Sequence, residues 1–317
     1  MSGRTGCGRG PGPGSRGRGP AADAGPEGRA VATGDHALWL RDAGVGEPVL
    51  LLHGFTNTGR SWDGIAARLR AAGRRTLAPD LVGHGRSAVP EGVASYTKAR
   101  CADDLAALLD ACGLRSAHVV GYSMGGRVAL AFAAAHPARV RTLVTVGASA
   151  GIADPAERAA RRESDAALAD AILRDGVAAF VARWMRQPLF SSQRRLGAAA
   201  LARMEAERLA QPARGLALSL RGMGAGAQAA LHAELPGLPM PALFVAGAED
   251  AKFVRLAHEL AAAVPGARAA VVPEAGHAAH LEQPDAFHAL LRDFLACHPI
   301  EGMEAIDTLE TIDRRRP

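Results

Sequence analysis

The stretch A-H-V-V-G-Y-S-M-G-G-R-V-A-L-A-F-A-A-A (residues 117–135) decides the fold. Residues 117–122 are a short apolar run that is typical of a buried strand, and residues 124–135 form an apolar, Ala-rich run that predicts a helix. Between them, Gly121 to Gly125 fits the pattern G-x-S-x-G. At the junction of a strand and a helix, this pattern predicts a sharp turn that lifts the Ser123 hydroxyl clear of the sheet.

Apolar strands and amphipathic helices alternate on both sides of this turn. A helix is predicted to start at the capping residue Thr97 and to close at Gly113. Strands this apolar are buried on both faces, which requires helices on both sides of a parallel sheet. The pattern therefore predicts an α/β fold with a mostly parallel, doubly wound sheet. Further strands are predicted at 49–53, 75–80, 140–146, 242–246 and 268–272, and further helices at 61–72, 252–264 and 284–297.

The alternation stops between residues 151 and 235, which are rich in Ala, Arg and Glu and predict several helices. Because ligands bind at the carboxyl ends of parallel strands, we expect this insertion to be a cap that shapes the substrate cavity. The core is then expected at residues 31–150 and 236–298. The insertion is more typical of a cap than of a separate domain, since the strand pattern resumes after it.

Both ends of the chain differ in composition from the core. Residues 1–30 are rich in Gly, Pro and Arg with almost nothing to bury, so they predict a disordered arm, and residues 299–317 predict a flexible tail. We interpret the arm as a nonessential extension or as the product of a start codon upstream of the true one. An RNA-binding arm is the alternative, but no aromatic residues are interleaved for stacking on bases.

The composition excludes several classes of protein. The 317 residues are 48% hydrophobic and 22% charged, which is enough to bury a core, and no run is long or apolar enough to span a membrane. Of the net charge of +5, the arm carries +3 and the tail −2, which leaves +4 on the body, a modest charge for its size, so no nucleic-acid partner is expected. Without a signal-peptide core or paired cysteine spacing, a cytoplasmic protein, monomeric or weakly homo-oligomeric, is expected. Its cysteines are Cys7, Cys101, Cys112 and Cys297.

A reactive serine needs a base, and the base needs an acid that orients it. In a fold of this kind the chain order is Ser, then Asp or Glu, then His. Asp250 follows the strand at 242–246, and His277 follows the strand at 268–272, so both are expected at the same edge of the sheet as Ser123. The sequence therefore predicts a Ser123–His277–Asp250 triad, with Glu249 as the alternative acid.

Backbone N–H groups after the first strong strand can stabilise negative charge. The N–H of Phe55, in H-G-F, is expected to form an oxyanion hole with the N–H of Met124. The nearby His53 and His84, together with His280, are expected to hydrogen-bond within turns, because their spacing fits no common metal site. No metal or cofactor is expected. Cys101 and Cys112 are expected on the buried face of their helix.

Four motifs together resemble the α/β-hydrolase superfamily: H-G-F (53–55), D-L-V-G-H-G-R-S (80–87), G-Y-S-M-G-G (121–126) and the late Asp and His. The serine at 123 argues against dehalogenases and epoxide hydrolases, which resemble this pattern but carry Asp there. Narrower strings resemble the 2-succinyl-6-hydroxy-2,4-cyclohexadiene-1-carboxylate synthases of menaquinone biosynthesis. These strings are G-Y-S-M-G-G-R, R-W-M-R-Q-P-L-F-S-S-Q (183–193), S-L-R-G-M-G-A-G-A-Q (219–228), G-A-E-D-A-K-F (247–253) and A-G-H-A-A-H-L-E-Q-P (275–284).

This resemblance implies a lyase that needs no cofactor. Its triad would abstract a proton from a cyclohexene that carries three carboxylates, and pyruvate would leave by elimination. Several arginines suit such a substrate, because guanidinium pairs with carboxylate through two parallel hydrogen bonds. Arg162 is hard to separate from its neighbour Arg161, and Ala278 departs from some members, which have Asn. By resemblance the substrate-binding residues are Arg127, Arg161, Arg208, Trp184 and Tyr122.

Two other functions remain open at this point. One is a serine carboxylesterase or C–C-bond hydrolase that uses the same triad through a covalent acyl-serine. The other is a ligand-binding relative without catalysis, which the presence of all three triad residues disfavours.

Overall fold

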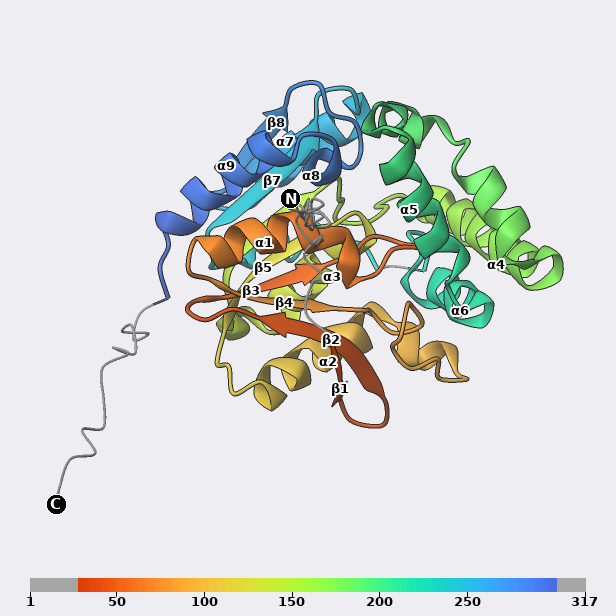
Figure 1. The fold of residues 1–317 in the computed structure, drawn as a ribbon, viewed down its shortest axis with the longest axis horizontal. Coiled ribbons are helices and arrows are strands. Elements are labelled where there is room, and N and C mark those ends of the chain that lie inside the picture. Colours follow the sequence, from red (N-terminus) through yellow and green to blue (C-terminus); the bar gives the residue numbers. More distant parts are fainter. Residues whose placement is uncertain (1–27, 228, 301–317) are drawn as a thin grey trace, which may run out of the picture.

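The computed structural model describes residues 28–227 and 229–300 (Figure 1). These residues form one eight-stranded sheet with the strand order β1-β2-β4-β3-β5-β6-β7-β8. The first two strands pair antiparallel, and the strands from β3 to β8 run parallel, so the mostly parallel α/β fold is confirmed. The strands are β1 (Arg29–Ala32), β2 (Ala37–Ala43), β3 (Pro48–Leu52), β4 (Arg75–Pro79), β5 (Ala117–Tyr122), β6 (Val140–Val146), β7 (Ala242–Gly247) and β8 (Arg268–Val272).

Helices cover both faces of the sheet because alternate strand residues point to opposite sides. In β3, Leu50 and Leu52 pack in the core with α2, α3 and α7, whereas Val49 and Leu51 pack in the core with α1 and α9. The helices that cover the sheet are α1 (Asp63–Ala71), α2 (Lys98–Ala111), α3 (Met124–Ala135), α7 (Ala251–Ala263), α8 (Ala279–Glu282) and α9 (Pro284–Ala296). Short 3-10 turns are η1 (Gly59–Trp62), η2 (Val93–Tyr96), η3 (Pro137–Arg139) and η5 (Leu235–Gly237).

The N-terminal strands were not predicted from the sequence. The boundary at residue 30 was wrong, since Arg29 and Ala30 already pair with β2 as part of β1. This edge strand is short and exposed, so it lacks the continuous apolar run of a central strand. At the other end, the backbone N–H of Ile300 donates to Glu47, so this residue of the predicted tail contacts the core. The rest of the predicted arm and tail lies outside the described residues.

The segment between β6 and β7 is helical, as predicted. Figure 1 shows α4, α5 and α6 gathered together on one side of the sheet. The chain leaves the core after Ala150 and returns to it at Leu231, whose N–H donates to the Ala150 carbonyl oxygen at 2.8 Å. A small core of its own, formed by α4 and α6, includes Phe180 and Leu216. The helices are α4 (Pro155–Trp184), η4 (Pro188–Leu196), α5 (Ala198–Leu209) and α6 (Ala213–Met223).

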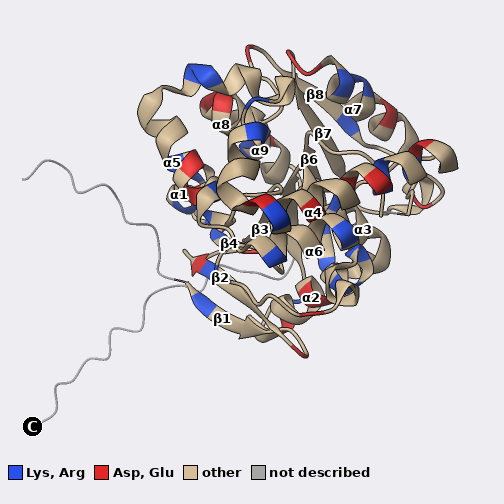
Figure 2. Cartoon of the chain, turned by 90° about the vertical axis from the view of Figure 1, so that its right-hand side faces the viewer, with Lys and Arg blue, Asp and Glu red and all other residues tan. Residues whose placement is uncertain are grey.

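Charged residues of both signs are intermixed along the helices (Figure 2). Within the described ranges, no helix combines the length and the apolar character that crossing a membrane requires.

Candidate active site

The turn at Ser123 has the strained geometry that its motif predicts. Ser123 lies between β5 and α3 with φ 52° and ψ −109°, a region that residues other than glycine rarely adopt. The flanking glycines are required for space: a Cβ at Gly125 would lie 2.3 Å from the Leu52 carbonyl oxygen, and one at Gly121 would lie 2.4 Å from the Gly125 carbonyl oxygen. The turn therefore packs directly against β3 and holds the hydroxyl above the sheet.

The three predicted triad residues are joined by hydrogen bonds. The Nε2 atom of His277 lies 3.0 Å from Ser123 Oγ, and its Nδ1 atom lies 2.8 Å from Asp250 Oδ2. The other carboxylate oxygen of Asp250 caps α7 by accepting from the Phe253 N–H at 3.4 Å. Each side chain comes from a different loop at the carboxyl edge of the sheet, so the geometry of a base oriented by an acid is complete.

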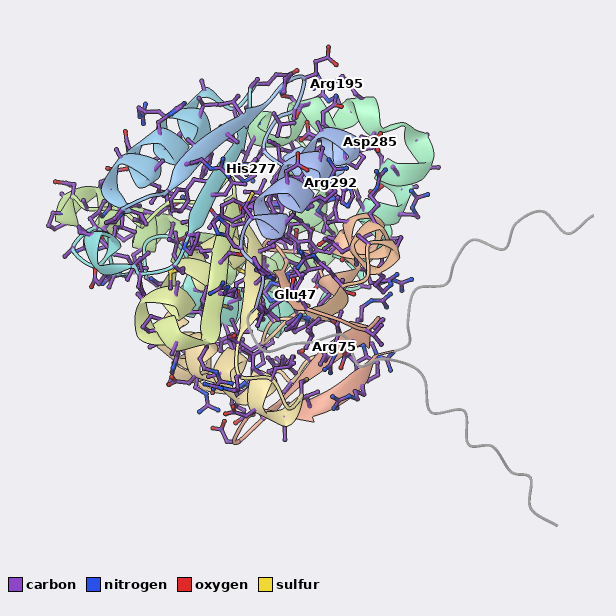
Figure 3. The ribbon with its side chains drawn as sticks, turned by 90° about the vertical axis from the view of Figure 1, so that its left-hand side faces the viewer. Glu47, Arg75, Arg195, His277, Asp285 and Arg292 are labelled. Atoms are coloured by element: carbon purple, nitrogen blue, oxygen red, sulfur yellow. The ribbon has the colours of Figure 1, made fainter. Side chains whose placement is uncertain are left out.

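Glu249, the alternative acid, points elsewhere. Both of its carboxylate oxygens accept from Arg195 at 2.9 Å, and its side chain is 43% exposed. Figure 3 shows Arg195 at the outer edge of the molecule, whereas His277 lies inside it. The structure thus brings Asp250, and not Glu249, to the imidazole.

The predicted oxyanion donors lie beside Ser123. Met124 is the first residue of α3, where helix geometry leaves its N–H without a helical partner. Gly54 holds the loop after β3 against the serine turn, because a Cβ there would lie 2.7 Å from the Tyr122 ring and 3.6 Å from Ser123 Cβ. Phe55 follows at once, and both Phe55 and Met124 line the cavity into which Ser123 opens.

This cavity has a volume of about 510 Å³, which suits a small molecule. Ser123 and His277 lie in its wall, together with all five residues that were predicted to bind substrate. Among the described lining residues, four are cationic, against the carboxylate of Glu157. The cavity is therefore suited to an anionic ligand. The cationic side chains are Arg127, Arg161, Arg208 and Lys252.

Arg127 and Arg161 form one side of this cationic wall. The N–H of Arg127 donates to the Ser123 carbonyl oxygen at 3.0 Å, so Arg127 lies one helical turn from the serine. Its Nη1 donates to the Met223 carbonyl oxygen at 2.7 Å, and burial lowers its pKa to about 10, with Arg161 adding to the effect. Arg161 is held by Asp165 at 2.8 Å. Arg162 donates instead to the Gly226 carbonyl oxygen and does not line the cavity.

Arg208 also lines the cavity and is 3% exposed. Its Nε donates to Thr56 Oγ1 at 3.3 Å, whereas its Nη1 makes no hydrogen bond to any residue that the structure describes. Burial lowers the pKa of Arg208, and the nearby Tyr122 and Glu207 oppose this. A buried guanidinium with an unused donor, facing a cavity, is a ready partner for a carboxylate.

The comparisons with known proteins agree with this geometry. Residues 47–284 match the family described as alpha/beta hydrolase fold. The chain belongs to the alpha/beta hydrolase fold family. Its predicted fold class is thereby confirmed a second time.

Two relatives of known name indicate a narrower family within this fold. A 2-succinyl-6-hydroxy-2,4-cyclohexadiene-1-carboxylate synthase from Klebsiella pneumoniae (strain 342) is 35% identical over 78% of this chain and 93% of its own. A Bacillus subtilis (strain 168) protein, provisionally given the same name, is 40% identical over 78% of this chain and 90% of its own. At this identity and coverage, the predicted membership of the synthase family is confirmed.

Solved structures show the same architecture. MenH from S. aureus superposes with a TM-score of 0.77 at 28% identity, covering 82% of this chain and 98% of that one. A thermophilic esterase from Thermogutta terrifontis, solved with malate bound, gives 0.75 at 29% identity, covering 84% and 95%. One fold is thus shared by relatives that catalyse different reactions. The residues that line the cavity, and not the fold, must therefore account for the difference in reaction.

Sequence reasoning did not single out several residues that line the cavity. Phe190 packs on Trp184 with ring centroids 5.5 Å apart, and Phe253 packs on His277 at 4.6 Å. Ser219 and Lys252 also line the wall. All four lie within the narrow strings quoted above, so a closer study of those strings could have found them.

The other histidines have structural surroundings. His53 contacts the Gly54 carbonyl oxygen through Nδ1 and accepts from the Leu81 N–H through Nε2, both at 2.8 Å, and His84 contacts the Val82 carbonyl oxygen, so both bond within turns as predicted. The same prediction for His280 was wrong. Neither of its ring nitrogens bonds to a described residue, and the ring packs instead against Trp62 and Tyr122, with ring centroids 4.2 and 4.6 Å away.

Two further predictions concern metals and cysteines. In the described part of the chain, no group of three or more His, Cys, Asp or Glu is arranged to hold a metal ion. Cys101 is buried in the core as predicted, whereas Cys112 is only half-buried. Cys7 lies outside the described residues.

Proposed function

We propose that the protein is a 2-succinyl-6-hydroxy-2,4-cyclohexadiene-1-carboxylate synthase, a carbon–oxygen lyase of menaquinone biosynthesis. Its substrate would be 2-succinyl-5-enolpyruvyl-6-hydroxy-3-cyclohexene-1-carboxylate, and its second product would be pyruvate. The observation that carries this proposal is a hydrogen-bonded Ser–His–Asp chain that opens into a cavity walled by Arg127, Arg161 and Arg208. Hydrolysis of a neutral ester would need the hydrogen-bonded Ser–His–Asp chain but not the arginines in the cavity wall.

The triad would act as a general base. Ser123 Oγ takes the ring proton at C2, next to the succinyl carbonyl, and passes its own proton to His277 Nε2, while Asp250 stabilises the imidazolium. Negative charge that develops on the succinyl carbonyl oxygen is met by the N–H groups of Phe55 and Met124. The electron pair of the broken C–H bond forms the C2–C3 double bond, and the former C3–C4 pair forms the C4–C5 double bond. The C5–O bond then breaks, and the enolpyruvate that leaves takes up a proton and becomes pyruvate.

The cationic wall would hold the substrate's three carboxylates around this reaction. Each guanidinium can give two parallel hydrogen bonds to a carboxylate, which fixes its orientation as well as its position. Trp184 and Tyr122 add apolar surface for the ring and its side chains. Binding energy from these remote groups would thus place C2 next to Ser123 Oγ.

The same proposal covers the organisation of the chain. Residues 151–235 would form the cap, and residues 29–150 and 236–300 would form the core to which it is attached. The enzyme would need no metal or cofactor and would act in the cytoplasm as a monomer or weak homo-oligomer.

The direct test is pyruvate release. Purified enzyme is mixed with the enolpyruvyl substrate, and pyruvate is followed by coupling to lactate dehydrogenase and NADH oxidation. We expect one pyruvate for each diene carboxylate formed, with turnover in the ordinary enzymatic range of about 1–1000 per second. Wild-type protein that forms neither product would refute the proposed function.

A serine carboxylesterase or C–C-bond hydrolase is the second candidate, because the triad geometry suits covalent catalysis equally well and the Thermogutta terrifontis neighbour is an esterase. It would turn over neutral p-nitrophenyl esters rapidly, and an acyl group on Ser123 would be visible by mass spectrometry. The lyase would turn over such esters slowly or not at all. A ligand-binding protein without catalysis would show neither activity.

Arg161 and Arg162 offer a matched pair for testing the cationic wall. We expect Arg161→Gln to raise KM for the enolpyruvyl substrate about tenfold to a hundredfold with a smaller change in kcat, because a charged hydrogen bond to the bound substrate is lost. Arg162→Gln should leave both constants within about threefold, since this side chain points to Gly226 and not to the cavity. Steady-state kinetics of pyruvate release measure both. Equal effects of the two substitutions would contradict this assignment.

A further inference from the structure

The loop that carries Phe55 is held from the cap as well as from the core. From the core side, Asp80 Oδ1 accepts from the Gly59 N–H at 2.8 Å. Thr56 has a φ of 70°, which β-branched residues rarely adopt, so this backbone needs external contacts to keep its shape. The direction of the Phe55 N–H therefore depends on what holds residues 54–59 in place.

Glu207 of the cap helix α5 makes two of these contacts. Its Oε1 accepts two hydrogen bonds from the same residue, one from the Thr58 N–H at 2.6 Å and one from the Thr58 hydroxyl at 2.5 Å. The hydroxyl also accepts from the Arg60 N–H at 3.2 Å, where it caps η1. Hydrogen bonds to a carboxylate are short and strong, so one oxygen atom fixes both the backbone and the side chain of Thr58.

The next residue of α5 holds the same loop. Arg208 donates from Nε to Thr56 Oγ1, and its guanidinium lines the active-site cavity. Adjacent residues of one cap helix thus hold alternate residues of the loop, with Asn57 between them in the cavity wall. Burial raises the pKa of Glu207, and the hydrogen bonds from Thr58 and the charge of Arg208 oppose this.

We propose that Glu207 is a positioning residue for the reaction: by binding Thr58 it sets the backbone of residues 54–59 and directs the Phe55 N–H at the negative charge that develops during catalysis. The packing of the cap helix α5 against this loop is thereby coupled to the formation of the oxyanion hole. Glu207 itself does not line the cavity with Ser123, so it acts through the loop and not on the substrate. The inference rests on the proposed use of the Phe55 N–H.

The experiment compares kcat and KM for pyruvate release in wild-type protein, Glu207→Ala, Glu207→Gln and Thr58→Val. We expect Glu207→Ala to lower kcat about tenfold to a hundredfold with KM within about threefold, because a misplaced donor affects the transition state more than binding. Glu207→Gln should restore kcat to within about threefold of wild type, since its amide oxygen still accepts both hydrogen bonds. Thr58→Val, which keeps the backbone donor alone, should fall between them.

Glu205, an exposed residue of the same helix, is the matched control. Glu205→Ala should leave kcat and KM unchanged, and thermal unfolding of each variant shows whether it is folded. An unchanged kcat in Glu207→Ala, an effect on KM alone, or a Glu207→Gln as slow as Glu207→Ala would overturn the proposal. If Glu207→Ala does not fold, Thr58→Val provides the test, and a wild-type kcat in Thr58→Val would overturn the proposal.

A second readout separates this proposal from the proposed function. The rate at which paraoxon phosphorylates Ser123, followed by intact mass, requires no enolpyruvyl substrate, yet its transition state also places charge in the oxyanion hole. We expect the phosphorylation rates to follow the same order as kcat. Wild type and Glu207→Gln should react fast, and Glu207→Ala should react about tenfold more slowly. Wild-type protein that is phosphorylated but releases no pyruvate refutes the function, and the phosphorylation rates then decide the role of Glu207 alone. Equal rates in all variants would overturn the positioning role.

Discussion

Replacement of Ser123 by alanine is expected to lower kcat for pyruvate release by about 10³- to 10⁴-fold, while KM changes by no more than about threefold. In the proposed mechanism the hydroxyl takes the proton, and His277 Nε2 lies 3.0 Å from it, so its removal would separate the base from the substrate. The arginines proposed to hold the carboxylates are untouched, which is why binding should survive. Pyruvate release under saturating substrate measures the effect.

Ser116 provides the control for this substitution. It immediately precedes β5, at the opposite end of the strand from Ser123, and is half-buried. Ser116→Ala should retain kcat within about threefold. If Ser123→Ala kept more than about a tenth of the wild-type kcat, the serine would not be the base, and an imidazole that acts directly on the substrate would be the simplest replacement.

Replacement of Gly125 by alanine is expected to damage the whole molecule. The added Cβ would lie 2.3 Å from the Leu52 carbonyl oxygen and 2.5 Å from the His53 carbonyl oxygen, and both belong to backbone that cannot rotate away. Either α3 or β3 must move, at a cost of about 3 kcal/mol in the free energy of unfolding. For a chain of this size we expect Tm to fall by roughly 4–6 °C, with loss of activity because the serine turn moves too. Differential scanning calorimetry measures the shift.

Gly64 is the matched glycine for this experiment. It is an exposed residue of α1, and a Cβ there would meet nothing within 4 Å. Gly64→Ala should leave Tm unchanged or raise it, because alanine favours helix by up to about 1 kcal/mol over glycine. Equal stability of Gly125→Ala and Gly64→Ala would show that the serine turn tolerates a side chain.

The parts of the fold that follow from continuous apolar runs could be predicted from the sequence. The strands at 117–122 and 140–146 begin and end where they were predicted, because a central strand of a parallel sheet is apolar on both faces. The strand at 268–272 also has its predicted bounds, although it lies at the edge of the sheet and only Val272 is buried. The edge strand β1 could not be predicted in the same way. Three of its four residues are exposed, so it depends on pairing with β2 and not on its own composition.

The candidate site was predictable where motif and strand end coincide, as for Ser123, Asp250 and His277. Residues of the helical segment between β6 and β7 were harder to predict. Arg161 and Arg162 are separated by about 100° around α4, and only the rotation of that helix against the core decides which of them meets the cavity. Glu207 contacts a residue 149 positions earlier, and no local pattern reports such a contact.

The hydrogen bond between Leu231 and Ala150 joins the two ends of the helical segment between β6 and β7. Everything from residue 151 to residue 230 is one continuous insertion whose two ends meet, so its length and sequence can change during evolution without shifting the register of β6 against β7. The triad, by contrast, lies on loops of the sheet itself. A lineage of this fold can therefore keep Ser123, Asp250 and His277 in place while mutations in a single uninterrupted segment of the gene change the part of the cavity wall that this segment supplies.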